Sequence, residues 1–259
     1  MVKKEICWNV TTRCNQACKY CHRFLNIADL TFEENNRILD NLIASGISEI
    51  TWTGGEALLL DGINELIMKS YKHGIKNKLI TNGKLLTNEK IDQISNYLDS
   101  ITLSIDSVDD NINNKLGRGI NHFSNIDTIL NKLQNTNIKI RINTVVNKYN
   151  LNSISKLVEC LNNYNVYSWR LFKFMPLRET AIKNQEEFDI TNNEFDKALK
   201  YVRKNTKIEK IESRVKDDME KKYILILADG SIVVTNKFED KKVGNALTDS
   251  IKSLFMEEV

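Results

Sequence analysis

The sequence has one proline, no long apolar run and little net charge, and each absence excludes a class of protein. None of its apolar runs in 259 residues approaches the length that spans a bilayer, so no membrane partner is expected. The first residues are charged and lack the apolar stretch of a signal peptide. A formal charge of +3 is too small for a nucleic-acid coat. We therefore expect a cytoplasmic protein with no nucleic-acid partner.

Cysteine is also scarce, and its arrangement is uneven. The five cysteines form an odd number in a long chain, which argues against a disulfide framework. Cys7 and Cys160 each stand alone, whereas Cys14, Cys18 and Cys21 lie within eight residues in a C-x3-C-x2-C pattern. This triplet is the strongest chemical signal in the chain.

Three thiolates on one short loop can occupy three corners of a cubane iron–sulfur cluster and leave the fourth iron open. The alternative is zinc, with His22 beside the triplet as a fourth ligand. Zinc sites of this kind usually draw their ligands from two separated pairs, and this sequence has no second pair. The spacing favours iron and sulfur, and a zinc-stabilised binding module is kept as an alternative.

The chain alternates between strand-like and helix-like segments for most of its length. Thr31 with Glu34, and Thr191 with Glu194, are spaced as capping boxes that begin helices. Six strand–helix repeats favour an α/β fold, a partial (βα)6 barrel with a parallel sheet and right-handed crossovers. The expected strands are 5–11, 47–52, 75–81, 100–106, 138–146 and 166–174, and the expected helices include 61–73, 108–115, 122–135, 151–162 and 192–204.

The last third changes character at Pro176. Residues 223–227 and 231–235 flank an Ala-Asp-Gly turn, which predicts a β-hairpin. We therefore divide the chain into a barrel core, 1–175, and a C-terminal extension, 176–259, that packs on the barrel and helps to close the substrate site.

Unusual residues fall where the expected strands end. In parallel α/β folds ligands bind at the carboxyl ends of the strands, so these positions are candidates for a site. Each motif alone is an ordinary turn or strand end, and their common location is what makes them informative. They are Gly54-Gly55-Glu56 after the second strand, Thr81-Asn82-Gly83 after the third, Ser104 and Asp106 at the fourth, and Asn143 on the fifth.

Together, the cysteine triplet, Tyr20 before its third cysteine and the Gly54-Gly55-Glu56 motif resemble the radical S-adenosylmethionine (SAM) superfamily over roughly residues 5–175. The resemblance implies that Cys14, Cys18 and Cys21 hold a 4Fe-4S cluster whose open iron is chelated by SAM. It implies SAM-binding roles for Tyr20, Thr53, Gly54, Gly55, Glu56, Thr81, Asn82, Ser104, Asp106, Arg118 and Asn143.

Further stretches resemble the viperin-like nucleotide dehydratases. They are 104–107 followed by Gly117-Arg118-Gly119, 141–147, Trp169-Arg170 and 223–225. In that family a 5′-deoxyadenosyl radical removes the C4′ hydrogen of a ribonucleoside triphosphate (CTP, UTP or GTP), and the 3′-hydroxyl leaves as water. The 3′-deoxy-3′,4′-didehydro product is a chain terminator with an antiviral or anti-phage role.

The same resemblance implies roles for further residues. Arg118, Arg141, Asn143, Arg170 and Lys173 would bind the substrate, and Tyr223 would donate a hydrogen or proton to the substrate radical. Without the resemblance, outward-facing arginines and a core tyrosine are the ordinary interpretations. The family also implies an external one-electron donor of the flavodoxin or ferredoxin type, and we expect a monomer.

The sequence also departs from the family. Ser168 stands where a second basic residue is expected before Trp169, and a C-terminal tail that folds over the substrate is not expected here. We expect the phosphate contacts to be rebuilt, with Lys237, Lys241 or Lys242 as candidates.

Residues 22–31 and the segment after Pro176 are expected to order over the substrate. The alternative function is a radical SAM enzyme that modifies a peptide or activates a glycyl-radical protein. Many of the peptide-modifying enzymes carry extra cysteines for auxiliary clusters, and this chain has too few.

Overall fold

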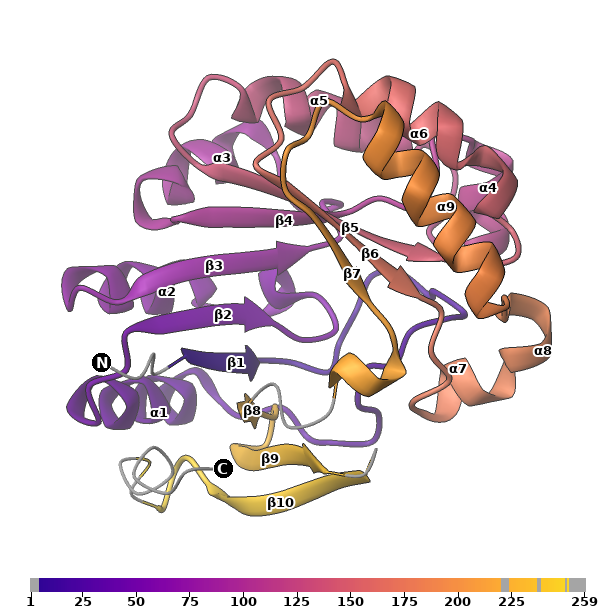
Figure 1. Cartoon of the computed structure of the whole chain (residues 1–259). Coiled ribbons are helices and arrows are strands. Elements are labelled where there is room, and N and C mark those ends of the chain that lie inside the picture. Colours follow the sequence, from indigo (N-terminus) through magenta and orange to yellow (C-terminus); the bar gives the residue numbers. More distant parts are fainter. Residues whose placement is uncertain (1–4, 220–223, 237–238, 250, 252–259) are drawn as a thin grey trace.

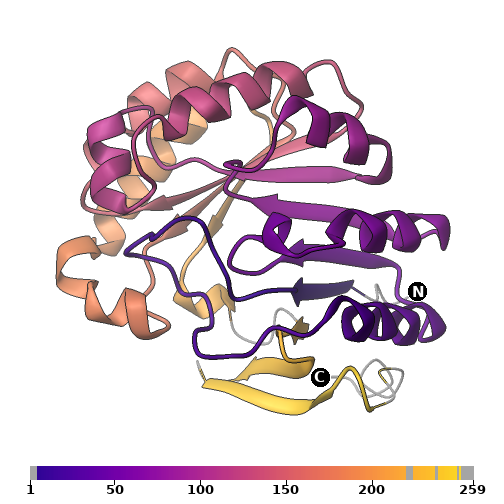
Figure 2. The same ribbon diagram turned by 180° about the vertical axis from the view of Figure 1, so that it is seen from behind.

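The computed structural model describes residues 5–219, 224–236, 239–249 and 251, and these form one curved sheet covered by helices on its outer face (Figures 1 and 2). The strand order is β10-β9-β8-β1-β2-β3-β4-β5-β6-β7. All pairings from β1 to β7 are parallel, as expected for a partial barrel of the α/β class.

The parallel strands are β1 (Glu5–Asn9), β2 (Glu49–Thr53), β3 (Lys76–Thr81), β4 (Ser100–Ser104), β5 (Lys139–Val146), β6 (Ser168–Lys173) and β7 (Ile211–Arg214). The main helices are α1 (Phe32–Ala44), α2 (Ile63–Lys72), α3 (Asn88–Ile94), α4 (Asp110–Leu116), α5 (His122–Leu133), α6 (Ile154–Leu161) and α9 (Asn192–Asn205). Two short helices, α7 (Glu179–Lys183) and α8 (Gln185–Phe188), precede α9.

Each central strand has one apolar face and one polar face. On β5, Ile140, Ile142 and Val146 are buried in the main core, while Arg141 and Asn143 alternate with them and stay half-buried. Because side chains alternate across a strand, the polar set lies on the concave side of the sheet, away from the helices. This alternation creates the polar interior in which a site can form.

Local sequence signals explain where the helices begin and end. The Thr31 hydroxyl accepts from the backbone N–H of Glu34, whose carboxylate accepts from the backbone N–H of Thr31, so the expected capping box is confirmed at the start of α1. The same reciprocal pair forms between Thr191 and Glu194 at α9. Gly46, just after α1, has a left-handed φ of +70°, as a C′ glycine should.

Several boundaries differ from the expected ones. The first strand ends at Asn9 instead of residue 11, and the fourth ends at Ser104 instead of residue 106. Asp106 and Ser107 therefore lie in the loop beyond β4, where side chains and not a neighbouring strand satisfy the backbone. The strand β7 was not expected, because Ile-Glu-Ser-Arg has no apolar alternation.

The C-terminal hairpin is confirmed and adds to the same sheet. β8 (Ile224–Ile226) pairs in parallel with β1 and antiparallel with β9 (Ser231–Asn236), and β9 pairs with β10 (Glu239–Asn245). The last strand was missed because its exposed, charged sequence, Glu-Asp-Lys-Lys, is typical of a sheet edge and not of a buried strand. The hairpin lies at the lower edge of the sheet in Figure 1.

One buried asparagine ties β3 to its neighbours. The Asn77 side chain accepts from the indole N–H of Trp52 (2.8 Å) and donates to the carbonyl oxygens of Ile67 (3.1 Å) and Tyr97 (3.0 Å). We expect Asn77→Ala to lower the free energy of unfolding by roughly 2–4 kcal/mol, because it leaves several buried polar groups without partners. Urea unfolding of the cluster-free chain would measure this loss.

Asn131→Ala is the matched control, since Asn131 is exposed on α5 and its side-chain amide donates to the carbonyl oxygen and carboxylate of Asp127 one turn earlier. A loss at Asn77 no larger than that at Asn131 would contradict this account of β3.

Candidate functional site

The cysteine triplet lies on the loop that follows β1, beyond the carboxyl ends of the strands (Figures 1 and 2). The backbone N–H groups of Ala17 and Lys19 donate to the carbonyl oxygens of Gly117 (3.1 Å) and Leu116 (3.0 Å) at the end of α4. This turn therefore supports the loop directly beneath Cys18.

The support requires glycine at position 117. Gly117 has a left-handed φ of +84°, and a Cβ there would lie 2.1 Å from the carbonyl oxygen of Ala17. No side chain fits between the turn and the cysteine loop without displacing one of them. In the sequence Gly117 is one of the two glycines that flank Arg118, and the structure shows that it also fixes the position of the loop.

Gly54 and Gly55 make a second close approach, to the chain entering the cysteine loop. The N–H of Gly55 donates to the Thr11 carbonyl (2.8 Å), and a Cβ at Gly55 would lie 2.1 Å from the carbonyl oxygen of Arg13. A Cβ on Gly54 would lie 2.4 Å from the carbonyl oxygen of Thr11. The glycine pair thus brings the ends of β1 and β2 together, which sets the base of the site.

Glu56 is buried and bound internally. Its carboxylate accepts from the hydroxyl of Thr81 (2.8 Å) and from the backbone N–H groups of Asn82 (2.8 Å) and Leu58 (3.2 Å). Burial raises its pKa, although these hydrogen bonds oppose the shift. The side chain of Asn82 in turn donates to that of Asn15, within the cysteine loop (2.8 Å). This chain of bonds connects the ends of β2 and β3 to the loop.

Asp29 was not singled out from the sequence, and it anchors the start of the cysteine loop. Its carboxylate accepts from the hydroxyl of Thr11, the backbone N–H of Thr12 (2.8 Å) and the Nε of Arg13 (3.0 Å). Burial raises its pKa, but these donors outweigh burial and the pKa is lowered overall. Only the fold brings residues 29 and 11–13 together, so no local pattern could have shown this contact.

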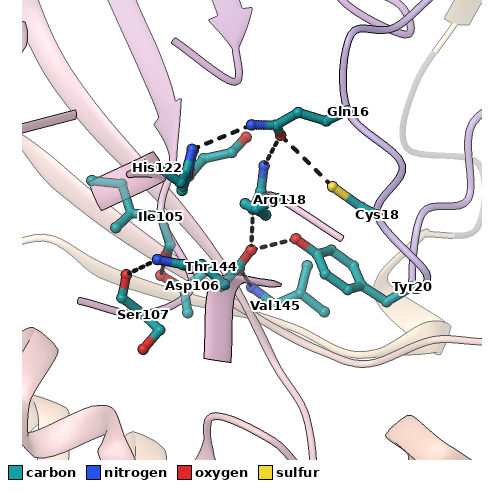
Figure 3. A network of polar contacts seen from close by, with 12 residues as sticks. Gln16, Cys18, Tyr20, Ile105, Asp106, Ser107, Arg118, His122, Thr144 and Val145 are labelled. Atoms are coloured by element: carbon teal, nitrogen blue, oxygen red, sulfur yellow. Dashed lines mark hydrogen bonds and ion pairs between the residues drawn. The ribbon is translucent and has the colours of Figure 1, made fainter. Parts of the chain in front are cut away.

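A buried ion pair lies under the loop (Figure 3). The Nε of Arg118 donates to the carboxylate of Asp106 (2.6 Å), which also accepts from the hydroxyl of Tyr20 and the backbone N–H of Val145 (2.8 Å). Tyr20 lies between the second and third cysteines, so this network holds the loop from inside. All three side chains were expected to contact the cofactor, and in this structure they bind one another.

The network continues through two residues that the sequence did not point to. Arg118 donates to the Oε1 of Gln16 (3.0 Å), whose amide nitrogen lies 3.2 Å from Nδ1 of His122 (Figure 3). Nε2 of His122 lies 3.1 Å from the carbonyl oxygen of Ser104, which can only accept, so Nε2 carries the hydrogen. Burial, with Arg118 nearby, lowers the pKa of His122 to about 4.

Three other candidate side chains are not engaged. Within the described ranges, Thr53, Ser104 and Asn143 have no side-chain hydrogen bond, and each is half-buried at or near the carboxyl end of its strand. Ser104 and Asn143 are register partners on adjacent strands, so they lie side by side on the concave face. These are the polar groups that a ligand above the sheet could reach.

The candidate arginines of β5 and β6 lie on this same concave face. Arg141 donates to the hydroxyl of Ser168 (3.4 Å) and stacks 4.9 Å from the ring centre of Tyr167. Arg170 is the register partner of Asn143, whereas its neighbours Trp169 and Leu171 are buried against the helices. The strands therefore bring Arg141, Asn143 and Arg170 together on one face.

Lys173 is not part of this group. Its register partner is the core residue Val146, so its side chain lies on the helix side of the sheet. There it lines a cavity of about 420 Å³ between the ends of β6 and α9 and lies 3.8 Å from Asp189.

Strand β7, which the sequence did not predict, adds charged side chains to the concave face. Glu212 on β7 accepts from both Nε (2.9 Å) and Nη2 (2.7 Å) of Arg170, and from Nη2 of Arg214 (3.2 Å). Because β7 has no apolar alternation, only its pairing with β6 could identify these residues as part of the site.

One arginine joins the segments that were expected to cover the substrate. Arg178, just after Pro176, donates to the carbonyl oxygen of His22 (2.8 Å), lies 3.9 Å from the ring centre of Phe24 and pairs with Asp240 (2.8 Å). Lys241 and Lys242 are exposed on β10, and Lys237 and Tyr223 lie outside the described residues.

The sequence profile described as "Radical SAM superfamily" matches residues 8–161. The chain belongs to the radical SAM superfamily. The matched segment includes the cysteine loop, the Gly54-Gly55-Glu56 turn and the buried Asp106–Arg118 pair.

Relatives of this radical SAM enzyme carry a more specific name. An "S-adenosylmethionine-dependent nucleotide dehydratase" of Flammeovirga pacifica is 31% identical over 225 residues, which cover 82% of this chain and 76% of the relative. One from Selenomonas ruminantium is 26% identical and covers 95% of this chain and 92% of the relative.

Solved structures agree on the fold. Streptococcus suis SuiB bound to S-adenosylmethionine matches 98% of this chain and 66% of its own, with a TM-score of 0.77 and 16% identity. Native anSMEcpe with bound AdoMet and the Cp18Cys peptide gives a TM-score of 0.79 at 18% identity, over 98% and 80% of the two chains.

Among the described residues, no helix is both long and apolar enough to cross a membrane.

Membership of the superfamily implies a 4Fe-4S cluster and SAM, and the cysteine loop fits the cluster. Cys14, Cys18 and Cys21 are free thiols. Burial raises the pKa of both Cys18 and Cys21, and a second cysteine of the triplet adds to each shift, Cys21 at Cys18 and Cys14 at Cys21. Burial raises the pKa of Cys18 to about 11, so binding of iron must displace its proton. In the described residues no three His, Cys, Asp or Glu side chains could hold one single metal ion.

The close contact at Gly117 can be tested directly. We expect Gly117→Ala to lose most of the iron that the unaltered chain takes up on anaerobic reconstitution, because the new Cβ displaces the Ala17 carbonyl and the loop with it. Iron and sulfide per chain would be measured.

Gly119→Ala is the matched control. Gly119 has a similar φ of +89° but open space around it, so its substitution costs only the left-handed conformation, about 1–2 kcal/mol. Equal iron contents in the two variants would show that the contact does not position the loop.

His122 predicts a pH dependence of stability. Its pKa is about 4 when folded and 6.5 when unfolded, so between these values the unfolded chain binds more protons. The contribution of His122 to the free energy of unfolding is complete above pH 6.5 and is lost as the pH falls toward 4. Between pH 7.5 and 5, the stability of the cluster-free chain relative to His122→Asn should fall by about 2 kcal/mol. Urea titrations at both pH values measure it, and exposed His73→Asn is the control. If the difference in stability between the unaltered chain and His122→Asn does not change with pH, the lowered pKa of His122 is contradicted.

Proposed function

We propose that this radical SAM enzyme dehydrates a ribonucleoside triphosphate (CTP, UTP or GTP) to its 3′-deoxy-3′,4′-didehydro analogue, as a viperin-like nucleotide dehydratase acting in antiviral or anti-phage defence in the cytoplasm. The observation that carries the proposal is the polar concave face of β5 and β6. Arg141, Asn143 and Arg170 share this face below the carboxyl ends of the strands, beyond which the cysteine loop lies. The names of the relatives supply the substrate class.

The proposed chemistry divides between the cofactors and the protein. When bound, the 4Fe-4S cluster and SAM supply a 5′-deoxyadenosyl radical, after one electron arrives from an external flavodoxin or ferredoxin. Cys14, Cys18 and Cys21 would hold the cluster. Thr53, Ser104 and Asn143, whose side chains bind no other described residue, would orient SAM or the ribose.

The residues that bind one another have a different role. The side chains of Glu56, Asp106, Arg118 and Tyr20 already bind partners inside the protein, and all four lie in buried positions. We propose that they position the cysteine loop and the end of β2 more than they contact SAM. A radical that abstracts almost any nearby hydrogen needs its target held in one place, so this rigidity serves selectivity.

Arginine side chains on a strand interior suit an anionic substrate. Arg141 forms no ion pair among the described residues, and its Nε is buried without a partner there. A buried donor of this kind costs free energy unless a ligand satisfies it. We also propose that the Arg178 contacts hold residues 22–24 and the hairpin together over the bound substrate, and Tyr223 remains our candidate donor to the substrate radical.

The reaction can be tested anaerobically. The reconstituted enzyme would receive dithionite, SAM and each of the four ribonucleoside triphosphates in turn, and 5′-deoxyadenosine and nucleotide products would be measured by mass. We expect one triphosphate to raise 5′-deoxyadenosine formation at least several-fold and to yield a product lighter by one water.

The control is the same assay with the matching nucleoside, which lacks phosphates. Slow 5′-deoxyadenosine formation that no nucleotide changes would reject the dehydratase and favour a peptide or glycyl-radical substrate.

A further inference from the structure

The charged residues of β7 form a group that the proposed reaction does not yet use. Arg170, Glu212 and Arg214 lie on the concave face and are only partly exposed, at 26%, 17% and 17% of their side-chain surface. Lys210 joins them at 3.7 Å from Glu212. In this group of four described residues, three cations therefore face one carboxylate.

Glu212 orients both guanidinium groups without using all their donors. Two N–H groups of Arg170 and one of Arg214 point to a single oxygen, Oε2. A guanidinium has five N–H groups, so each arginine keeps donors free. The Nε of Arg214 is buried and has no partner among the described residues. The pair is thus held in place with hydrogen-bonding capacity to spare.

The position of the group matches one end of an elongated ligand. Register pairing places four residues in a row across adjacent strands: Glu212 on β7, Arg170 on β6, Asn143 on β5 and Ser104 on β4. The carbonyl of Ser104 connects through His122 to Gln16 in the cysteine loop. A ligand whose reacting end lies near that loop would extend across β4 and β5 and place its far end at β6 and β7.

We propose that Arg170 and Arg214 bind the terminal phosphates of the substrate, and that Glu212 is a positioning residue that holds the two guanidinium groups for this contact. The inference rests on the proposed nucleotide function. It adds the residues that distinguish a triphosphate from a mono- or diphosphate. Paired arginines present fixed forks that match phosphate oxygens, and the excess of positive charge favours a polyanion over a single carboxylate. In this proposal the rebuilt phosphate contacts lie on β6 and β7.

Binding can be measured apart from turnover. Isothermal titration of the reconstituted enzyme with SAM would use inorganic tripolyphosphate, and then the mono-, di- and triphosphates of cytidine, uridine and guanosine. We expect Arg214→Ala to weaken tripolyphosphate and triphosphate binding about 10- to 100-fold, the loss of one charge-assisted contact, and to leave monophosphate binding nearly unchanged. Arg214→Lys, which keeps the charge but loses the fork, should fall between.

Arg203→Ala is the matched control, because it removes the same charge from an exposed site on α9. Glu212→Gln tests positioning. If Glu212 only neutralised charge, every anion would bind more tightly, whereas we expect the preference for triphosphate over diphosphate to fall. Circular dichroism would confirm that each variant is folded.

The outcomes separate the two proposals. Equal binding of tripolyphosphate and triphosphate by Arg214→Ala and Arg203→Ala would overturn the phosphate site, as would an unaltered enzyme that binds none of these anions. A second outcome is that Arg214→Ala loses binding while the unaltered enzyme forms no dehydrated product from any triphosphate. This outcome would support the phosphate site and reject the proposed reaction.

Discussion

The buried ion pair between Asp106 and Arg118 is the interaction on which the site depends. It lies where β4 ends, and the same carboxylate receives Tyr20 from the cysteine loop and the backbone of Val145 from β5. Removing one partner of such a pair leaves an uncompensated buried charge, which typically costs about 3–5 kcal/mol. The loop is therefore not a flexible appendage but part of the packed interior, and its cysteines are placed by contacts made far from them in sequence.

Close backbone contact is the second constraint. Three glycines, Gly54, Gly55 and Gly117, let the loop rest against β2 and α4 at distances that a Cβ would forbid. Motifs of this kind are often explained by access to a ligand. Here the structure gives a second reason, because the glycines also set where the chain before and within the cysteine triplet lies. Ligand access and loop placement are thus combined in the same residues.

The concave face separates two electrostatic environments. Near the cysteine loop, Asp106, Arg118 and Glu56 are paired inside the protein, whereas the side chains of Thr53, Ser104 and Asn143 have no hydrogen-bond partner in the described part of the chain. On β6 and β7, the described group of Arg170, Lys210, Arg214 and Glu212 has three cations and one carboxylate. A ligand with a neutral reacting part and an anionic tail would suit this arrangement of charge, and this is the physical argument behind our proposal of a nucleotide instead of a neutral peptide.

The sequence by itself determined the class of the protein: the cysteine spacing, the capping boxes of α1 and α9 and the strand–helix alternation are local patterns, and local patterns carry fold class and cluster chemistry. It also placed Arg141 and Arg170 in strands, though not on a face. Only the tertiary structure decided that Asp29 and His122 support the loop, that Lys173 lies on the opposite side from Arg170, and that β7 exists. The reason is physical: β7 is too short and too polar to show a period, and contacts between residues far apart in sequence arise only when strands pair in register.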